Sequence, residues 1–406
     1  MFKIRPVVAR DLLLPDNTVD LSKWAVVACD QFTSQPEYWE TLTQWVGGAP
    51  STRYLIYPEA YLDHITDEAV ANINKKMETY VQKNVFKILP ASMVLVDRRY
   101  AEGGRRLGLV TTIDLETYDY RPEAKALIRS TEETVLSRVP PRMAIRKDAS
   151  LELSHVMLLI NDNQQSVIEV LYDQKDQFPK VYDFALNMEG GHIAGYQIQN
   201  VEAVYDALDK LVDDPSNPVM FLVGDGNHSL ATAKTHWEAI KKTLPETEWD
   251  KHPARYSLVE IVNIYDEGLE FEGIHRLLFN VDESFIQQLQ DAITPEVPTW
   301  VYTKTLGKKE LLIPKSTATA YEQIQTFIDN YLKEHPNASI DYIHGEQELI
   351  SITNRDVRNI AIYMPVLAKS DLFPFVKEGK ILPRKSFSMG SAEHKRYYLE
   401  TQIIKI

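Results

Sequence analysis

The chain has 406 residues, of which 44% are hydrophobic and 25% charged, and its formal net charge is −14. This composition is typical of a globular protein with a sizeable core, and the acidic balance disfavours general nucleic-acid binding, which needs clustered Lys and Arg. The single cysteine, Cys29, excludes an intrachain disulfide and a multi-cysteine zinc site. Because no apolar run reaches membrane length and no signal core is present, we expect a cytoplasmic protein without membrane or nucleic-acid partners; homo-oligomerisation stays open.

In the N-terminal region, a strand over residues 24–28 is followed by a helix that begins with Pro36 and ends at the glycine pair after Val46. Asp30 lies in the loop between them. Loops after strands often carry chemistry in α/β folds, so Asp30 is a candidate general base, with an ordinary turn residue as the alternative. The pattern then predicts a helix over 59–84 and a hairpin of strands over 93–100 and 107–115.

The stretch from Arg129 to Thr134 combines a guanidinium group, hydroxyl groups and an expected helix start. Ser130 and Glu133 have the spacing of a capping box, which predicts a helix directly after Ser130. A helix start with Arg129 beside it can hold an anion, and a plain cap is equally compatible with the pattern.

The elements after this stretch follow from hydrophobic periodicity. They are strands over 156–160 and 167–172, a glycine-rich loop over 188–196 with His192, a helix over 201–212, a strand over 256–264, an apolar run over 271–278 with His275 and Arg276, helices over 284–293 and 319–334, and strands over 340–343 and 348–353. The glycines around His192 either allow close backbone approach to a ligand or simply turn the chain.

One segment combines a buried strand, a tight turn and a helix start. Residues 218–224 form a short apolar run, and helical spacing begins after Gly226, with Asn227 or Ser229 as the expected N-cap. Such a junction presents backbone N–H groups and the positive end of a helix dipole, which favours a phosphate or carboxylate. Asp225 and His228 add a carboxylate and an imidazole there; a structural turn is the alternative.

Near the C-terminus, two basic clusters and two serines lie within a short distance of each other. The first cluster contains Lys385 and precedes Ser386, and the second contains Arg396. A phosphate clamp and a solvated tail are both compatible with this pattern, and the neighbouring glycine and aromatic residues favour the clamp.

Four sequence blocks resemble the family named domain of unknown function 1015. They are residues 224–234, 190–196, 269–276 and 382–390, and the resemblance extends over essentially the whole chain. The block at 224–234 is also similar to the nucleotide-phosphate turn of the ParB, sulfiredoxin and free-serine-kinase superfamily. On that resemblance, Asp225, Gly226, His228 and the helix start at Ser229 match the turn. Ser229 itself stands where those proteins carry arginine, and Arg129, Arg276, Lys385 or Arg396 would have to replace it.

The fold expected from these elements is α/β or α+β, with mixed sheets, flanking helices and a ParB- and serine-kinase-like core with large additions. We divide the chain at a soft boundary into residues 1–120 and 121–406, in one large or two interleaved domains.

Three functions are compatible with the sequence. The first is an enzyme that binds a phosphate ester or nucleotide and transfers a phosphoryl group to or from serine or a similar small hydroxy metabolite. In it, Asp225 holds Mg²⁺ or accepts a proton, His228 is the general acid or base, and Asp30 is a reserve base. Residues expected to contact an adenine nucleotide or an anionic metabolite are Gly226, Asn227, Ser229, Arg129, Thr131, Glu132, His192, His275, Arg276, Lys385, Ser386 and Arg396.

The second function is non-catalytic binding of a nucleotide or metabolite in the same site. The third is a metal-dependent hydrolase that uses His228, Asp225 and either His192 or His275. No His-x-x-x-His or paired-Cys spacing supports that reading, so no zinc is expected.

Overall fold

The computed structural model of the protein describes residues 5–27, 32, 35–58, 61, 64–153, 156–390 and 394–405. The chain divides into two compact units. Unit 1 comprises residues 1–130, 134–269 and 391–406, and unit 2 comprises residues 131–133 and 270–390.

Unit 1 is built on one large sheet, which has twelve strands in the described part of the chain. The strand order is β4-β5-β10-β7-β11-β3-β2-β1-β18-β6, with β9 also paired to β2 and β8 to β9. The strands are β1 Arg10–Pro15, β2 Phe86–Arg99, β3 Arg105–Asp114, β4 Tyr118–Asp119, β5 Ile128–Ser130, β6 Leu151–Leu153, β7 Met157–Ile160, β8 Lys180–Ala185, β9 His192–Ile198, β10 Phe221–Asp225, β11 Tyr256–Asn263 and β18 Thr401–Ile403.

The sheet is mixed. β10 runs parallel to β5 and antiparallel to β7, whereas the predicted hairpin of β2 and β3 is antiparallel, with Val94 opposite Val110. Successive residues of β2 contribute to different cores, since Val94 and Val96 belong to one apolar cluster and Met93 and Leu95 to another. This alternation is the period of two that a sheet with two covered faces requires.

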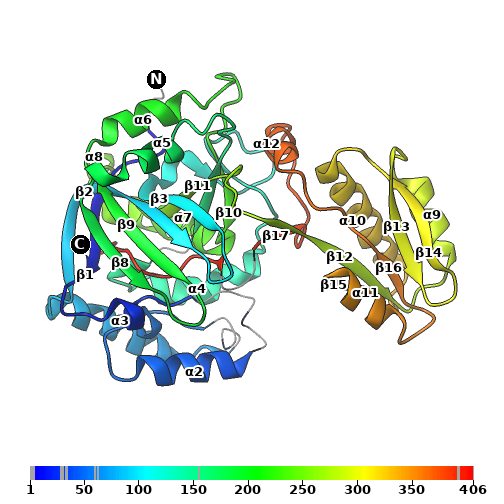
Figure 1. Ribbon diagram of the computed structural model, residues 1–406, viewed down its shortest axis with the longest axis horizontal. Helices are drawn as coiled ribbons and strands as arrows, with labels where there is room; N and C mark the ends of the chain where they lie inside the picture. Colours follow the sequence, from blue (N-terminus) through cyan, green and yellow to red (C-terminus); the bar gives the residue numbers. More distant parts are fainter. Residues whose placement is uncertain are drawn as a thin grey trace. The chain divides into compact units, whose positions relative to one another are not determined.

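Helices cover both faces of this sheet (Figure 1). Trp39 of α2 and Ile73 of α3 pack into the cluster of one face, and Val204 of α6 and Trp237 of α7 into that of the other. The helices of unit 1 are α1 Leu21–Trp24, α2 Pro36–Val46, α3 Asp67–Gln82, α4 Val139–Arg146, α5 Ile168–Asp173, α6 Val201–Asp209, α7 Asn227–Lys241 and α8 Glu246–Trp249, with short 3₁₀ turns η2 Thr52–Tyr54, η4 Leu115–Thr117, η5 Leu136–Arg138, η6 Lys175–Gln177 and η7 Pro253–Arg255.

Two predicted strands of unit 1 are wrong. In the described part of the run at 24–28, which ends at residue 27, Trp24 is the last residue of α1, a helical turn that starts where the Asp20 carboxylate accepts the Ser22 N–H. Val26 then makes an isolated bridge to Tyr398. The run at 167–172 is the helix α5, since Asp162 accepts the backbone N–H groups of Ser166 and Val167 and turns the chain there. Short apolar runs fit a helix and a strand equally well, and local side-chain caps decide between them here.

Unit 2 contains a six-stranded antiparallel sheet in the order β14-β13-β16-β12-β15, with β17 also paired to β12. Its elements are β12 Phe271–Phe279, α9 Ser284–Ala292, β13 Val297–Thr303, β14 Gly307–Ile313, α10 Thr317–Glu334, β15 Ser339–His344, α11 Glu346–Thr353, β16 Ile360–Ile362, α12 Lys369–Lys377 and β17 Phe387–Met389.

The predicted strand at 348–353 is wrong, because this segment is α11. Gly345, with a φ of 81°, ends β15 and precedes the helix. Leu349 is buried against Leu277 of β12, and Ile352 packs on the same cluster. The spacing of three residues between these two side chains gives the helix one apolar face.

The predicted class, an α/β protein with mixed sheets and flanking helices, is confirmed. The proposed boundary near residue 120 lies inside unit 1, between β4 and β5, which pair with each other. Among the described residues, every helix is too short or too polar to cross a bilayer.

Candidate functional site

The turn between β10 and α7 depends on glycine. β10 ends at Asp225, α7 begins at Asn227, and Gly226 is the N-cap residue with a φ of 80°. A Cβ atom at residue 226 would lie 2.9 Å from the Cα atom of Val156. Both the left-handed conformation and this close approach therefore require glycine. The expected cap at Asn227 or Ser229 is wrong, because both residues lie within the first turn of the helix.

Asp225 is held between the helix start and a lysine from the C-terminal segment. Its Oδ1 accepts the Gly226 N–H at 2.8 Å, and its Oδ2 lies 3.3 Å from the Nζ of Lys395. Lys395 is only 8% exposed. The first turn of α7 carries no acidic residue, so the positive helix end, Lys395 and Asp225 meet in one place.

Lys395 was missed as a site residue by the sequence analysis, which selected Arg396 from the same basic cluster. The Arg396 side chain is buried and pairs with Glu260 and Glu400 in the core of unit 1. Adjacent basic residues thus have different roles, and only the fold around His394–Arg396 distinguishes them. The sequence feature that pointed to Lys395 was the basic cluster as a whole, which does not distinguish its members.

Ser130, Thr134 and Val135 of unit 1 contact the start of α7. The Ser130 hydroxyl donates to Asn227 Oδ1 at 2.7 Å, and Asn227 Nδ2 donates to Thr134 Oγ1 at 3.0 Å. The backbone N–H of Val135 donates to His228 Nε2 at 3.2 Å. Two motifs that lie about ninety residues apart in the sequence are therefore joined by side-chain hydrogen bonds.

This arrangement corrects the helix predicted after Ser130. Ser130 is the last residue of β5, which pairs in parallel with β10 and so brings its end beside the end of β10. The contacts with α7 use the Ser130 hydroxyl, which the capping-box interpretation assigned to a new helix, and the backbone N–H of Val135. They also fix the tautomer of neutral His228, because a ring nitrogen that accepts an N–H is unprotonated and the proton is then on Nδ1.

Arg129 supports the strand before the turn. Its Nε donates to the carbonyl of Ala126 at 2.9 Å, and its Nη2 donates to Asn217 Oδ1 at 2.5 Å and to the Pro218 carbonyl at 3.3 Å. Burial lowers the pKa of Arg129. These contacts hold the turn that leads into β10.

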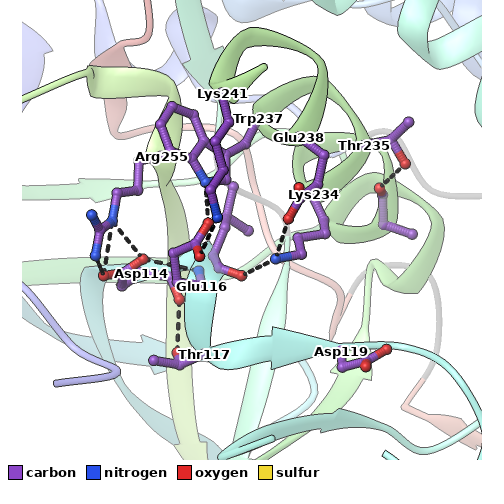
Figure 2. A network of polar contacts seen from close by, with 12 residues as sticks. Asp114, Glu116, Thr117, Asp119, Lys234, Thr235, Trp237, Glu238, Lys241 and Arg255 are labelled. Atoms are coloured by element: carbon purple, nitrogen blue, oxygen red, sulfur yellow. Dashed lines mark hydrogen bonds and ion pairs between the residues drawn. The ribbon is translucent and has the colours of Figure 1, made fainter. Parts of the chain in front are cut away.

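The body of α7 is anchored to the 3₁₀ turn η4, as Figure 2 shows. Glu116 accepts hydrogen bonds from Trp237 Nε1 at 2.5 Å and Lys241 Nζ at 2.7 Å, and Lys234 Nζ donates to the Leu115 carbonyl at 2.9 Å. Lys234 also pairs with Glu238 at 2.8 Å. These contacts fix the helix, so the groups at its first turn are positioned by a rigid element.

His192 lies elsewhere in unit 1. It is the first residue of β9, and β7, β11, β3 and β2 separate β9 from β10 in the sheet order. Its half-exposed ring pairs with Asp183 through Nε2 at 2.9 Å. The structure therefore does not bring His192 to the β10–α7 turn.

Arg276 and Lys385 meet in unit 2. Arg276 is fully buried, and its guanidinium donates to Gln325 Oε1 at 2.9 Å and to the Lys385 carbonyl at 2.8 Å. Its Cζ lies 5.3 Å from the ring centre of Tyr321 and 4.9 Å from that of Tyr342. Burial lowers the pKa of Arg276. The guanidinium therefore holds the backbone at Lys385, which has a φ of 59°.

Three further predicted residues gather in the same part of unit 2. The Thr131 carbonyl accepts the Leu382 N–H at 2.8 Å, and Glu132 Oε1 accepts the Ser386 N–H at 3.2 Å. Glu132 also forms an isolated parallel bridge with Leu382. Anion binding by Arg276, Lys385 and this group stays a prediction.

His275, the neighbour of Arg276, is a core residue of unit 2. It is 5% exposed, its Nδ1 accepts the Met364 N–H at 3.2 Å, and its ring stacks on Tyr363 at 4.3 Å. Burial lowers its pKa to about 4. The neutral imidazole is therefore part of the folded unit.

This pKa predicts an acid-sensitive contribution to stability. His275 binds its proton more weakly when folded than when unfolded, so its contribution is complete above pH 6.5 and is lost as the pH falls towards 4. Replacing His275 by phenylalanine keeps a ring and removes the titration. The free energy of unfolding is measured with urea between pH 7 and pH 4. Over this range we expect it to fall by roughly 1–3 kcal/mol less for His275→Phe than for the wild type. Parallel stability curves for the two proteins would contradict this role.

Asp30, the reserve base, lies outside the described residues, and its role stays a prediction. Within the described ranges, no group of three or more His, Cys, Asp or Glu residues is placed to hold a metal ion. A Mg²⁺ ion at Asp225 would thus depend on phosphate oxygens and water for its remaining ligands, as is common for this ion.

The chain matches one protein family over most of its length and is weakly similar to several solved structures. A family model described as "Protein of unknown function (DUF1015)" matches residues 10–401, and no curated protein matches the chain. Weak overall similarities to solved structures include a conserved hypothetical protein from Pyrococcus furiosus (TM-score 0.36, 10% identity, 73% of this chain and 95% of that one). A mutant free serine kinase in complex with AMP (TM-score 0.39, 8% identity, 73% and 92%) and a C-terminally truncated SbnI from Staphylococcus aureus (TM-score 0.36, 10% identity, 70% and 83%) are similar at the same level.

Proposed function

Because this chain belongs to the DUF1015 family, whose function is unknown, we propose from the geometry of the β10–α7 turn that it binds a small phosphorylated metabolite or an adenine nucleotide and transfers a phosphoryl group. The acceptor or donor is serine or a similar small hydroxy compound. One observation carries the proposal: Asp225, His228 and Lys395 surround the first turn of a fifteen-residue helix that begins at a left-handed glycine.

Phosphate binding is supported by the charges at this turn. The N-terminus of a long helix attracts anions through its N–H groups and its dipole. Lys395 adds a full positive charge on a largely buried side chain, where solvent screens its interactions less than at the surface. The phosphate-binding turn that this segment resembles carries an arginine where this chain has Ser229. In our proposal, Lys395 supplies the positive charge of that arginine.

The roles of the other groups follow from their hydrogen bonds. Asp225 is the general base that accepts the proton of the attacking hydroxyl, and a phosphate that draws Lys395 away would free its Oδ2 for this task. His228 donates its Nδ1 proton to a phosphate oxygen, since Nε2 is occupied by the Val135 N–H. In the alternative in which Asp225 holds Mg²⁺ instead of accepting the proton, the ion would neutralise charge on the phosphate oxygens.

A second function, binding without turnover, is favoured by one specific observation. Both carboxylate oxygens of Asp225 and the Nε2 of His228 already have partners within unit 1. Such internally paired groups are expected in a protein that binds a metabolite without turnover, and they are also compatible with an enzyme that has no substrate bound. A metal-dependent hydrolase gains no comparable support, because His192 lies several strands away from Asp225 in the sheet order.

A ligand screen tests the proposal. We expect ATP, ADP, AMP or phosphoserine to raise the melting temperature of the wild type, because a ligand present at about 100 times its Kd stabilises the folded state by roughly 2.7 kcal/mol. Lys395→Met is expected to lose most of this shift. The matched control is Lys251→Met, which removes an exposed lysine from the same unit and should leave the shift unchanged.

The same samples separate the two functions. Phosphorus NMR of the wild type with ATP, Mg²⁺ and serine reports turnover directly. Stabilisation together with turnover supports the enzyme, and stabilisation without turnover supports the receptor. An unchanged melting temperature with all four ligands would overturn both.

A further inference from the structure

Lys395 lies between two residues that are held by contacts to other parts of unit 1. On its C-terminal side, Arg396 is buried and pairs with Glu260 and Glu400. On its N-terminal side, His394 contacts the tip of the β2–β3 hairpin, which comprises residues 100–104. The backbone on both sides of Lys395 is therefore fixed, and its flexible four-carbon side chain is the part that can move.

The hairpin tip contacts His394 through an aromatic ring and a carboxylate. The ring of Tyr100 stacks on the imidazole, with the ring centres 3.8 Å apart and an angle of 20° between the planes. Glu102 Oε1 pairs with Nε2 of His394. The stack fixes the plane of the imidazole, and the pair with Glu102 fixes its rotation within that plane.

Arg106 joins the hairpin to the backbone beside Lys395. Its Nη1 donates to the His394 carbonyl at 2.5 Å and to the Tyr100 hydroxyl at 3.4 Å. The His394 carbonyl belongs to the peptide bond that connects His394 to Lys395, so this hydrogen bond acts directly on the backbone of the lysine. Arg106 is 2% exposed and pairs with Glu260, which makes it a firm support.

Glycine gives the hairpin tip the shape that these contacts need. Gly103 and Gly104 have φ values of 103° and 92°, which L side chains rarely adopt. The Gly103 N–H donates to the Tyr100 carbonyl at 3.2 Å, and the Tyr100 N–H donates to the Gly104 carbonyl at 3.2 Å. This tight turn allows Tyr100 and Glu102 to contact the same imidazole.

We propose that Tyr100, Glu102 and His394 are positioning residues for Lys395, and that the hairpin tip thereby sets how strongly the β10–α7 turn binds an anion. The first part concerns only the placement of Lys395 Nζ 3.3 Å from Asp225 Oδ2. The second part rests on the proposed function. In it, the side chain of Lys395 moves from Asp225 to the bound phosphate while its backbone stays in place, which lowers the entropic cost of binding.

Chemical acetylation tests the placement of Lys395 without any ligand. The full chain reacts with a limiting amount of acetic anhydride, and peptide mass spectrometry gives the relative rate at each lysine. The reagent needs an accessible, unprotonated amine, so a buried lysine that is paired with a carboxylate reacts slowly. A lysine that is released from Asp225 reacts faster.

Two substitutions remove the contacts of the hairpin tip in steps. We expect Glu102→Ala to raise the rate at Lys395 roughly two- to fivefold, because it removes one partly exposed ion pair. His394→Ala removes the ring stack as well and is expected to raise the rate roughly tenfold. The matched control is Glu78→Ala, which removes an exposed glutamate of α3 and should leave the rate unchanged.

Lys234 and Lys241 report the fold of α7 in the same spectra. Both contact η4 and should react as slowly in the variants as in the wild type. An unchanged rate at Lys395 in Glu102→Ala and His394→Ala overturns the positioning role. A rise in Glu102→Ala that Lys234 and Lys241 share equally also overturns it, because the effect is then not specific to Lys395.

Calorimetric titration tests the second part, with ATP, ADP, AMP and phosphoserine as the probes. We expect a probe that binds the wild type to bind Glu102→Ala and His394→Ala more weakly, in the same order as the acetylation rates rise. Equal affinity in all three proteins, together with faster acetylation of Lys395, would show that the hairpin tip holds the lysine without setting the affinity. If no probe binds the wild type, the proposed function fails, and the acetylation rates still decide the first part.

Discussion

Asp225→Asn is expected to abolish phosphoryl transfer while leaving ligand binding largely intact. Asparagine has nearly the same shape and can still accept the Gly226 N–H, but it cannot take up a proton from an attacking hydroxyl. Loss of a general base reduces turnover by roughly 10²–10⁴-fold. The measurement is the rate of phosphoserine formation from ATP and serine, followed by phosphorus NMR.

The control for this prediction is Asp206→Asn, an exposed aspartate of α6 in the same unit. Its turnover should match that of the wild type. Asp225→Asn is expected to lower the melting temperature moderately, because the largely buried Lys395 then loses its carboxylate partner, so turnover is compared at a temperature where both proteins are folded. Undiminished turnover in Asp225→Asn would remove this carboxylate from the mechanism.

The sequence predicted the elements whose pattern is local and strong. β2 and β3 alternate apolar residues on both sides of a Gly-Gly turn, so their hairpin follows from period and turn chemistry alone. The junction of β10 and α7 could be predicted equally well, because Gly226 lies between an apolar run and a segment with helical spacing.

Short segments were less predictable because tertiary contacts decide their structure. α5 and α11 have apolar spacings that suit a strand as well, and Asp162 in one case and packing on Leu277 in the other select the helix. Ser130 illustrates the same limit for a motif. Its hydroxyl has the spacing of a cap, but pairing of β5 with β10 gives it Asn227 as its partner.

The cation of the candidate site could not be selected from the sequence. Lys395 lies 170 positions after Asp225, next to an arginine of equal charge, and only the fold of the C-terminal segment determines which of the two approaches the carboxylate. The alternative choice, Arg396, instead neutralises glutamates in the core. Both side chains are buried, so the difference concerns which carboxylate each one approaches, and hydrophobic periodicity does not report such tertiary contacts.

The core position of Arg396 leads to the second large expected effect, a loss of stability in Glu260→Gln. Glu260 is fully buried, and its Oε2 lies 3.4 Å from Nη2 of Arg106 and 3.3 Å from Nε of Arg396. Gly108 makes room for this carboxylate, because a Cβ atom there would lie 2.0 Å from Glu260 Oε1. Glycine at position 108 is therefore needed for the Glu260 carboxylate to fit in the interior of unit 1.

Glutamine fills the same volume without the negative charge, so, among the described residues, Arg106 would lose its ion-pair partner Glu260 and Arg396 would keep the pair with Glu400. Breaking a buried ion pair from one side costs about 3–5 kcal/mol, because the remaining charge stays desolvated. We expect a clearly lower urea midpoint for Glu260→Gln, followed by the fluorescence of the buried tryptophans of unit 1. The control is Glu246→Gln, an exposed glutamate in the first turn of α8, which should change the midpoint little. A wild-type midpoint for Glu260→Gln would mean that neutral donors hold the two arginines as well as a carboxylate does, and that the burial of this charge serves something other than stability.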